Sequence, residues 1–420
     1  MSLSFLLTSW GNPGNLNPFL TAARRLSQKG HRVRFIDEAC HGEEITRAGF
    51  EHIAWRRPAP LVPPTAGEGD PAWTEIRAIL GQMTFGGAID YAADTMDALR
   101  REPVDAILTN DLLAGPAIAA EAAGVPYALL APHISVRPLD GVPSGINGLV
   151  PDDTAEYHAA EDVLRMRLIE LLNSYLPVIN RARAAFGLLP LNHVFDHYDR
   201  ADRVLIGMSA AFDFNATRLP ANLRYVGPLL DTPEWAHAWV SPWSDNSTRP
   251  RVLVSLSTSF QNQAALLQRI IAALGTMELD AIVTVGPAMM KETFAAPSNV
   301  SILPGAPHDI VMKEVSLVVT HAGHGTVARS LVNGVPLLVI PMGRDQGGNA
   351  IRVVARGAGL ALSDGATEAE IASTIVRLLG ERHYQVAAAQ LGKAMATDLG
   401  SFALVAEMEE MATRSWRRSA

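Results

Sequence analysis

The 420-residue chain carries 35 basic and 43 acidic side chains, a formal net charge of −8, and 48% of its residues are apolar. This composition is typical of a folded globular protein, and the length suffices for two or three domains that each bury a core. The acidic balance argues against a general nucleic-acid surface. The chain also has no apolar run of about 18 residues that could span a membrane.

Cysteine content and the start of the chain bear on its location. Cys40 is the only cysteine, so the chain cannot form an internal disulfide, and a reducing compartment fits. The apolar run at residues 3–7 is too short for a signal peptide and follows no basic segment. We therefore expect a cytoplasmic protein in which residues 3–7 form a buried strand.

Strand-length apolar runs alternate with helical patterns through the first half of the chain. After residues 3–7 come a Gly/Asn/Pro turn and apolar residues at helical spacing from Leu16 to Leu26, closed by Gly30. Further strands are expected at residues 33–36, 105–109, 125–131 and 203–207. This alternation predicts a parallel, doubly wound sheet.

The second half repeats the pattern after a break. Residues 231–250 are rich in Pro, Ser, Asp and Trp without periodicity, which indicates an interdomain linker. Strands are expected at 252–256, 281–285, 316–319 and 335–340, with a helix from about residue 264. We predict the α/β class, with one domain at 1–230, a second at 251–400, and an amphipathic helix at 401–420 that packs back towards the first.

The segment from Val318 to Ala328 is the most informative in the chain. A buried strand runs into His321-Ala-Gly323-His-Gly325-Thr326, a glycine turn that opens a helix. Such a turn lets the backbone approach an anion, and the helix N-terminus presents unpaired N–H groups, so the segment predicts a phosphate site. An ordinary tight turn, or a dinucleotide fingerprint with Asp345 as its acid, fits the motif alone.

Neighbouring segments extend the motif. Pro307-His308 precedes it, and Pro341-Met-Gly-Arg-Asp345-Gln346-Gly-Gly-Asn349-Ala350 follows the next strand. Together they resemble the donor-site signature of GT-B nucleotide-sugar glycosyltransferases, in particular bacterial natural-product enzymes related to plant secondary-product UDP-glucosyltransferases. Residues 30–33 and 226–228 fit the same pattern. The resemblance implies two Rossmann-like domains facing across a cleft, the first binding the acceptor and the second the nucleotide sugar.

The resemblance also implies inversion at the anomeric carbon and no cofactor or metal. No Asp-x-Asp, the metal-diphosphate device of the other large glycosyltransferase class, occurs in the chain. The neutral or protonated imidazole of His321 can bond the diphosphate, and the backbone N–H groups of Gly323, Gly325 and Thr326 can surround it. The matched family uses the Asp345-Gln346 pair for sugar hydroxyls.

Three loops complete the expected donor site. Asn349 and the Ser257-Thr258 loop should lie near the phosphates, because loops at the carboxyl ends of strands flank one crevice. His308 stands where the family holds the base and ribose. Two plainer interpretations stay open: serine and threonine after a strand often cap a helix, and His308 could be a cap or a surface residue.

The first βα loop departs from the family. Relatives carry a catalytic His there, sometimes Asp, whereas this chain has Asn15, and an amide cannot accept a proton near neutral pH. The orienting carboxylate of the family corresponds to Asp111. We therefore expect Asp111 to be the base, with Asn15 positioning the acceptor; His133 is the second candidate, and Asp111 as a helix N-cap is the plain alternative.

Acceptor specificity is expected from the first domain. Long connections around residues 55–85 and 132–153, and an apolar helix at 164–176, contain residues suited to a flat hydrophobic aglycone. Any single one of them also suits an ordinary core. The candidates are Trp73, Met83, Phe85, His133 and Met166.

The sequence thus predicts a glycosyltransferase that moves a hexose from a nucleotide diphosphate to a small, largely apolar acceptor. UDP-glucose is the first expectation for the donor and a dTDP-sugar the second, and no nucleic acid or membrane span is involved. Alternatives are a non-catalytic sugar-nucleotide binder, motivated by Asn15, a sugar-nucleotide epimerase, and an NAD-dependent oxidoreductase. Closure of the domains around the donor is also expected.

Overall fold

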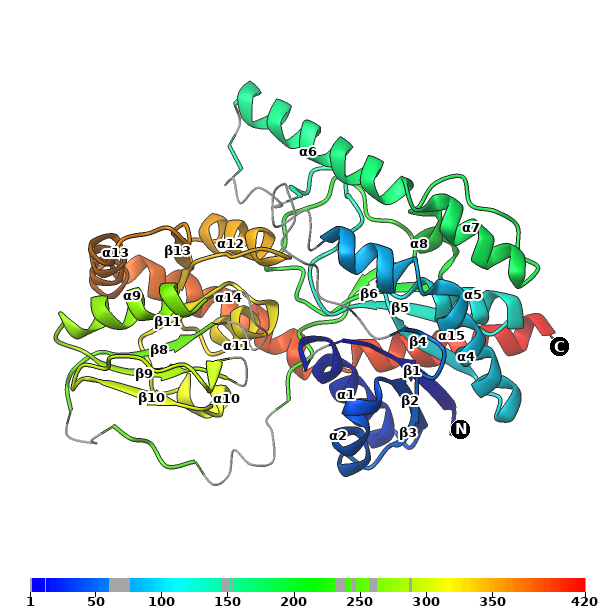
Figure 1. Ribbon diagram of the computed structural model, residues 1–420, viewed down its shortest axis with the longest axis horizontal. Coiled ribbons are helices and arrows are strands. Elements are labelled where there is room, and N and C mark those ends of the chain that lie inside the picture. The colour runs from blue at the N-terminus through cyan, green and yellow to red at the C-terminus, as the bar shows by residue number, and fades with distance from the viewer. Residues whose placement is uncertain are drawn as a thin grey trace.

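The computed structural model describes residues 2–11, 13–59, 76–144, 151–152, 154–231, 239–243, 247–256, 263–286 and 289–419. Within them the chain forms two β-sheets, each covered by helices, in two halves that lie side by side (Figure 1). All described strand pairs in both sheets are parallel. The predicted α/β class with two doubly wound, Rossmann-like halves is confirmed.

The first sheet has seven strands in the order β3-β2-β1-β4-β5-β6-β7. The chain moves outward from β1 to β3 and then resumes on the other side at β4, so the switch point lies between β1 and β4. Loops after these central strands therefore meet at one crevice. The strands are β1 (Ser4–Thr8), β2 (Arg32–Asp37), β3 (Glu51–Ala54), β4 (Ala106–Asn110), β5 (Tyr127–Ala131), β6 (Arg203–Ile206) and β7 (Leu223–Tyr225).

Side chains that alternate along the strands of this sheet pack into two separate hydrophobic cores, one on each face. One face packs on α4, α5 and α7, and the opposite face packs on α1 and α15. The helices of this half are α1 (Pro13–Gln28), α2 (Gly42–Arg47), α4 (Ala88–Arg101), α5 (Ala114–Ala123), α6 (Ala155–Asn173), α7 (Leu176–Ala185) and α8 (Asp196–Arg200), with the short helical segments η1 (Ala39–His41) and η2 (Leu80–Thr84).

The second sheet has six strands in the order β10-β9-β8-β11-β12-β13, with its switch point between β8 and β11. The glycine turn that follows β11 therefore lies at the crevice of this sheet. Its elements are β8 (Arg251–Ser255), α9 (Ala264–Gly275), β9 (Asp280–Thr284), β10 (Val300–Leu303), α10 (His308–Val311), β11 (Leu317–Thr320), α11 (His324–Val332), β12 (Leu337–Val339), α12 (Gln346–Ala355), β13 (Gly359–Ala361), α13 (Glu368–Gly380) and α14 (Arg382–Gly400).

The chain returns to the first half at its end. Helix α15 (Ala403–Ser419) runs beside α14 and then along the first sheet, on the face that α1 also covers (Figure 1). Leu404, Val405 and Met408 are buried there among side chains of the first half. His31 adds an ion pair to Glu409 at 2.8 Å. Helix α15 thus packs on the first half.

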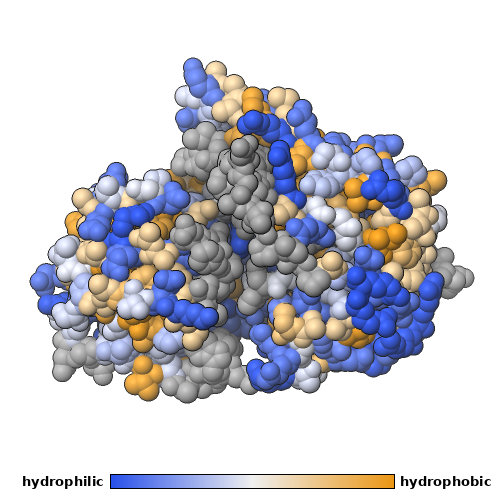
Figure 2. All heavy atoms as spheres, viewed as in Figure 1, coloured by the Kyte–Doolittle hydropathy of each residue, from blue (hydrophilic) through white to orange (hydrophobic). Residues whose placement is uncertain are grey.

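The surface is mixed in character. Figure 2 shows hydrophobic residues scattered among hydrophilic ones over the coloured part of this face of both halves. Scattered apolar residues are usual on a protein surface and indicate no binding site by themselves. Across the described ranges, no helix is both long and apolar enough to cross a membrane.

Candidate functional site

The predicted phosphate loop lies between β11 and α11. Gly323 is the N-cap of α11, and no side chain caps this helix end. A Cβ on Gly323 would lie 2.5 Å from Nε2 of His321, so the imidazole occupies the space that only glycine leaves. Ala322, between the two, has a φ of 68°, which is strained for a residue with a Cβ. The turn is held in one shape, with the amides at the start of α11 exposed to a ligand.

His321 is electrically neutral in this setting. Burial lowers its pKa to about 4, although the carboxylate of Asp345 pulls the other way. Its Nδ1 lies 3.3 Å from the Thr320 hydroxyl. Gly325 and Thr326 follow His321 in the chain and lie in the first turn of α11.

The second donor loop runs from β12 to α12 and is tied to the first. Asn349 donates from Nδ2 to the carbonyl of Ala322 at 3.0 Å and to Oδ2 of Asp345 at 2.9 Å. Its Oδ1 is buried without a hydrogen-bond partner in the described part of the chain. Gln346 accepts a bond from the amide of Met342 at 2.7 Å. The structure thus brings Asp345, Gln346 and Asn349 next to the glycine turn, as the sequence predicts.

His308 begins α10 on the other side of α11. It is half-buried, and burial lowers its pKa to about 4, with a further lowering by Arg329. Arg329 in α11 pairs with the neighbouring Asp309. His308 is therefore a neutral side chain at the start of α10.

Asp111 and His133 meet at the carboxyl ends of β4 and β5. Nε2 of His133 lies 3.1 Å from Oδ1 of Asp111; the side chain of Asp111 is buried and that of His133 is 13% exposed. The ring N–H is not aligned on the carboxylate oxygen, so the contact is an ion pair rather than a linear hydrogen bond. The hydroxyl of Tyr198 donates to Oδ2 of Asp111 at 3.3 Å. Because α5 begins only at Ala114, Asp111 is not a helix N-cap.

His133 carries a proton. Burial alone would lower its pKa, but the Asp111 carboxylate, with smaller help from the carbonyl of Ile134 and from Asp345, raises it to about 9. Nδ1 faces the Ile134 carbonyl at 2.7 Å while Nε2 faces Asp111. Both ring nitrogens therefore face acceptors, and neither is free to take a proton from a substrate. The geometry favours Asp111 over His133 as the base.

Asn15 lies in the first turn of α1, half-buried. Its Nδ2 would be 3.2 Å from a Cβ on Gly11, so the amide covers the turn after β1. Strands β1 and β4 pair directly, which places the Asn15 and Asp111 loops at one crevice. The partners of Asp111, however, come from the loop after β5 and from α8 rather than from Asn15.

A small cavity opens beside Asp111. Its volume is about 20 Å³, which is room for a single water molecule. Phe85, predicted to contact the acceptor, lines it. Met166 does not line it and is 56% exposed on α6. Trp73, Ser257 and Thr258 lie outside the described residues, as does the side chain of Met83.

Two residues of the site were missed from the sequence. Tyr198 follows no motif, and only the fold brings it to Asp111. His324 stands inside the glycine motif, yet its partner is in the other half of the protein: Nε2 donates to the carbonyl of Gly207 at 3.2 Å. Burial lowers the pKa of His324, so its imidazole is neutral. This bond joins the start of α11 to the loop after β6.

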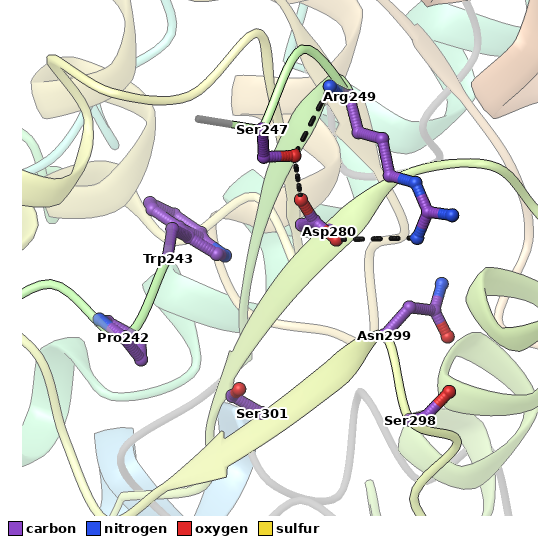
Figure 3. Close-up of a pocket in the computed structure, with 8 residues that line it drawn as sticks. All are labelled: Pro242, Trp243, Ser247, Arg249, Asp280, Ser298, Asn299 and Ser301. Carbon is purple, nitrogen blue, oxygen red and sulfur yellow. Dashed lines mark hydrogen bonds and ion pairs between the residues drawn. The ribbon is translucent and has the colours of Figure 1, made fainter. Parts of the chain in front are cut away.

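A larger pocket, of about 290 Å³, lies elsewhere (Figure 3). Ser247, Arg249 and Asp280 form one wall, where the Ser247 hydroxyl donates to Asp280 at 2.6 Å. These residues precede or begin β8 and β9, so the pocket is at the amino ends of the strands. Ligands of such sheets bind at the opposite, carboxyl ends. This pocket is therefore separate from the donor loops.

Comparisons with known proteins cover almost the whole chain. Residues 268–411 match the family model described as erythromycin biosynthesis protein CIII-like, C-terminal domain. The chain is 26% identical over 409 residues to 4'-demethylrebeccamycin synthase of Lentzea aerocolonigenes, covering 93% of this chain and 95% of the relative. It is 24% identical over 439 residues to 3-alpha-mycarosylerythronolide B desosaminyl transferase of Saccharopolyspora erythraea, covering 97% and 98%.

Solved structures give the same picture of the fold. The glycotransferase of kitacinnamycin superposes with a TM-score of 0.77 at 19% identity, over 98% of this chain and 99% of that one. The calicheamicin glycosyltransferase CalG4 superposes equally well at 17% identity, over the same shares. Both have the architecture that the sequence resemblance implied.

Proposed function

We propose that the chain is a GT-B glycosyltransferase of natural-product biosynthesis, and that it transfers a hexose from a nucleoside diphosphate to a hydroxyl of a small, largely apolar acceptor, with inversion. UDP-glucose is the first candidate donor and a dTDP-sugar the second. The reaction would take place in the cytoplasm, where the exposed, unpaired Cys40 stays reduced.

The observation that carries the proposal is the pair of tied loops after β11 and β12. Asn349 joins them through Ala322 and Asp345, so a phosphate-binding helix start and a carboxylate for sugar hydroxyls form one unit. An NAD-dependent oxidoreductase is disfavoured. Its acid should end the strand after the glycine helix, whereas Asp345 lies beyond β12 at the start of α12.

Chemistry at the acceptor would use Asp111. The acceptor hydroxyl displaces Tyr198 from Oδ2, gives its proton to that oxygen, and its oxygen attacks the anomeric carbon from the face opposite the diphosphate. The bond from the anomeric carbon to the diphosphate oxygen breaks. A phenolic hydroxyl needs the least help, because it is far more acidic than an alcohol. His133 positions Asp111 and balances its charge.

Stabilisation of the leaving diphosphate would come from the chain itself. The amides at the start of α11 and the imidazole of His321 would donate to it. Binding of the diphosphate dianion favours the protonated form of His321. We therefore propose that transfer needs no divalent metal, and that transfer continues undiminished in excess EDTA.

The test of the proposed function is a thermal-shift titration with UDP, dTDP, UDP-glucose, dTDP-glucose and NAD. A nucleotide that binds only the folded chain raises its melting temperature by mass action. A selective rise in melting temperature with UDP or dTDP supports the proposal and identifies the nucleotide base of the donor. A rise with NAD alone, or with none of the five, overturns it. NMR of the product's anomeric configuration tests inversion.

A further inference from the structure

The cavity beside Asp111 has apolar walls from separate segments of the chain. Phe85 stacks on Tyr175 with ring centroids 5.3 Å apart and forms one wall. Leu172 of α6 and Phe195, which precedes α8, form the others. Aromatic and aliphatic walls that converge beside a carboxylate suit a flat apolar ring.

Two polar atoms at this cavity have no partner. Nε2 of His197 and Oγ1 of Thr84 are buried and lack a hydrogen bond to any described residue. His197 is 6% exposed and Thr84 is 3% exposed, and both line the cavity. A buried polar atom without a partner costs about 1–3 kcal/mol. Two such atoms at one cavity need a partner that the described residues do not supply, and a hydroxyl of a bound acceptor would be such a partner.

His197 is neutral and close to the proposed base. Burial lowers its pKa to about 4 and Arg183 lowers it further, although Asp111 and Glu121 oppose this. A neutral imidazole can bond a hydroxyl without competing as a cation for the Asp111 carboxylate. The adjacent residue, Tyr198, is the one that bonds Asp111. Helix α8 therefore contributes two polar side chains, His197 and Tyr198, to the lining of the cavity.

We propose that this cavity is the acceptor subsite and that it selects aromatic acceptors with two neighbouring hydroxyls. One hydroxyl faces Asp111 and is glycosylated; the second bonds His197 and Thr84. The proposal rests on the proposed function for the identity of the first hydroxyl. At its present volume the cavity is closed, so the ring enters by displacing the η2 wall that contains Leu80 and Thr84.

The experiment compares naphthalene-2,3-diol with 2-naphthol, which lacks the second hydroxyl. Their dissociation constants are measured by calorimetry for the protein saturated with UDP or dTDP, whichever binds. The wild-type protein should bind the diol about tenfold more tightly, since a hydrogen bond contributes about 0.5–1.5 kcal/mol. His197→Phe and Thr84→Val should each reduce this preference towards unity.

Tyr157→Phe is the matched control. It removes another buried hydroxyl without a partner, on α6 and outside the residues that line this cavity, so the preference should stay tenfold. Melting temperatures check that all three variants fold. A preference retained in both cavity variants, or no binding of either naphthalene, overturns the proposal. Because binding is measured, a chain that binds the diol as described yet transfers no sugar would refute the proposed function alone.

Discussion

At the scale of single residues, the histidine that relatives place in the first loop is absent, and a different histidine lies beside the same carboxylate. His133 comes from the loop after β5 and is protonated, so it is a cation beside Asp111 and cannot act as a base. In the proposed function the roles of the two groups would be exchanged relative to the family pattern, with Asp111 accepting the proton and His133 positioning Asp111.

Replacement of Asp111 tests this exchange. Asp111→Asn keeps the shape of the side chain and its bond to Tyr198 but cannot accept a proton, so turnover should fall by about 10²–10⁴-fold. The affinity for UDP or dTDP should not change, because Asp111 is in the other half of the protein. Asp199→Asn, at an exposed aspartate paired with Arg137, is the control. Turnover of Asp111→Asn within threefold of wild type would contradict the assignment.

The proton on His133 gives a pH dependence with a definite sign. Its pKa is raised in the folded state, to about 9, from about 6.5 in the unfolded chain. Its contribution to stability is therefore fully present below about pH 6.5 and is lost as the pH rises through 9. The difference in urea midpoint between wild type and His133→Gln should be largest at acid pH and vanish above pH 9.

Turnover should also depend on whether His133 is protonated. Wild-type turnover should decline above about pH 9, because His133 loses its proton and with it the ion pair to Asp111. His133→Gln should be slower and should lack that limb. His383→Gln, at an exposed histidine of α14, is the control for the profile. A high-pH limb that persists unchanged in His133→Gln would show that another group is responsible.

At the scale of elements, the sequence predicted every central strand and missed β3, β7, β10 and β13. These four are the edges of the two sheets. An edge strand is paired on one side only and is partly exposed, so its residues need not form an apolar run. The glycine turn was predictable because its residue types are dictated by local geometry: Gly323 must leave room for His321.

Two glycines of that turn offer a matched pair of substitutions. A Cβ at position 323 meets the His321 ring at 2.5 Å, whereas a Cβ at 325 meets nothing within 4 Å. Gly323→Ala should displace the imidazole, lower the melting temperature and weaken nucleotide binding at least tenfold. Gly325→Ala should keep or slightly raise the melting temperature, since alanine favours a helix by about 0.5–1 kcal/mol over glycine. Equal melting temperatures for the two variants would argue against the steric role of His321.

At the scale of the whole molecule, the site is assembled from both halves, and this is the part that sequence reasoning could not supply. His324, in the turn after β11, bonds the carbonyl of Gly207, and the carboxylate of Asp345 helps to raise the pKa of His133. Such contacts join residues far apart in the chain and depend on how the halves are set against each other. No spacing or periodicity carries that information. Asp345, Gln346 and Asn349 lie beside the glycine turn, as the sequence predicts, whereas nothing in the sequence pointed to Tyr198 as a partner of Asp111.

The same interface contains a buried ion pair that links the donor helix to the first half. Arg352 of α12 donates to Oδ1 of Asp213 at 2.7 Å, with both side chains 2% exposed. The hydroxyl of Tyr225 donates to Oδ2 of Asp213 at 2.7 Å, and the Arg352 guanidinium lies 5.2 Å from the ring of Phe214. Removing one partner of such a pair leaves a buried charge, at a cost of about 3–5 kcal/mol.

Arg352→Leu should therefore loosen the two halves rather than unfold either one. Small-angle scattering should show a larger radius of gyration for this variant, and UDP or dTDP should bind more weakly, because α12 carries Gln346 and Asn349. Asp213→Asn in the same chain removes the buried charge and should restore part of both properties. Arg377→Leu breaks an exposed pair with Glu381 and should change neither. An unchanged radius with unchanged nucleotide affinity would mean that the halves are held together elsewhere and that α12 does not couple the donor site to the first sheet.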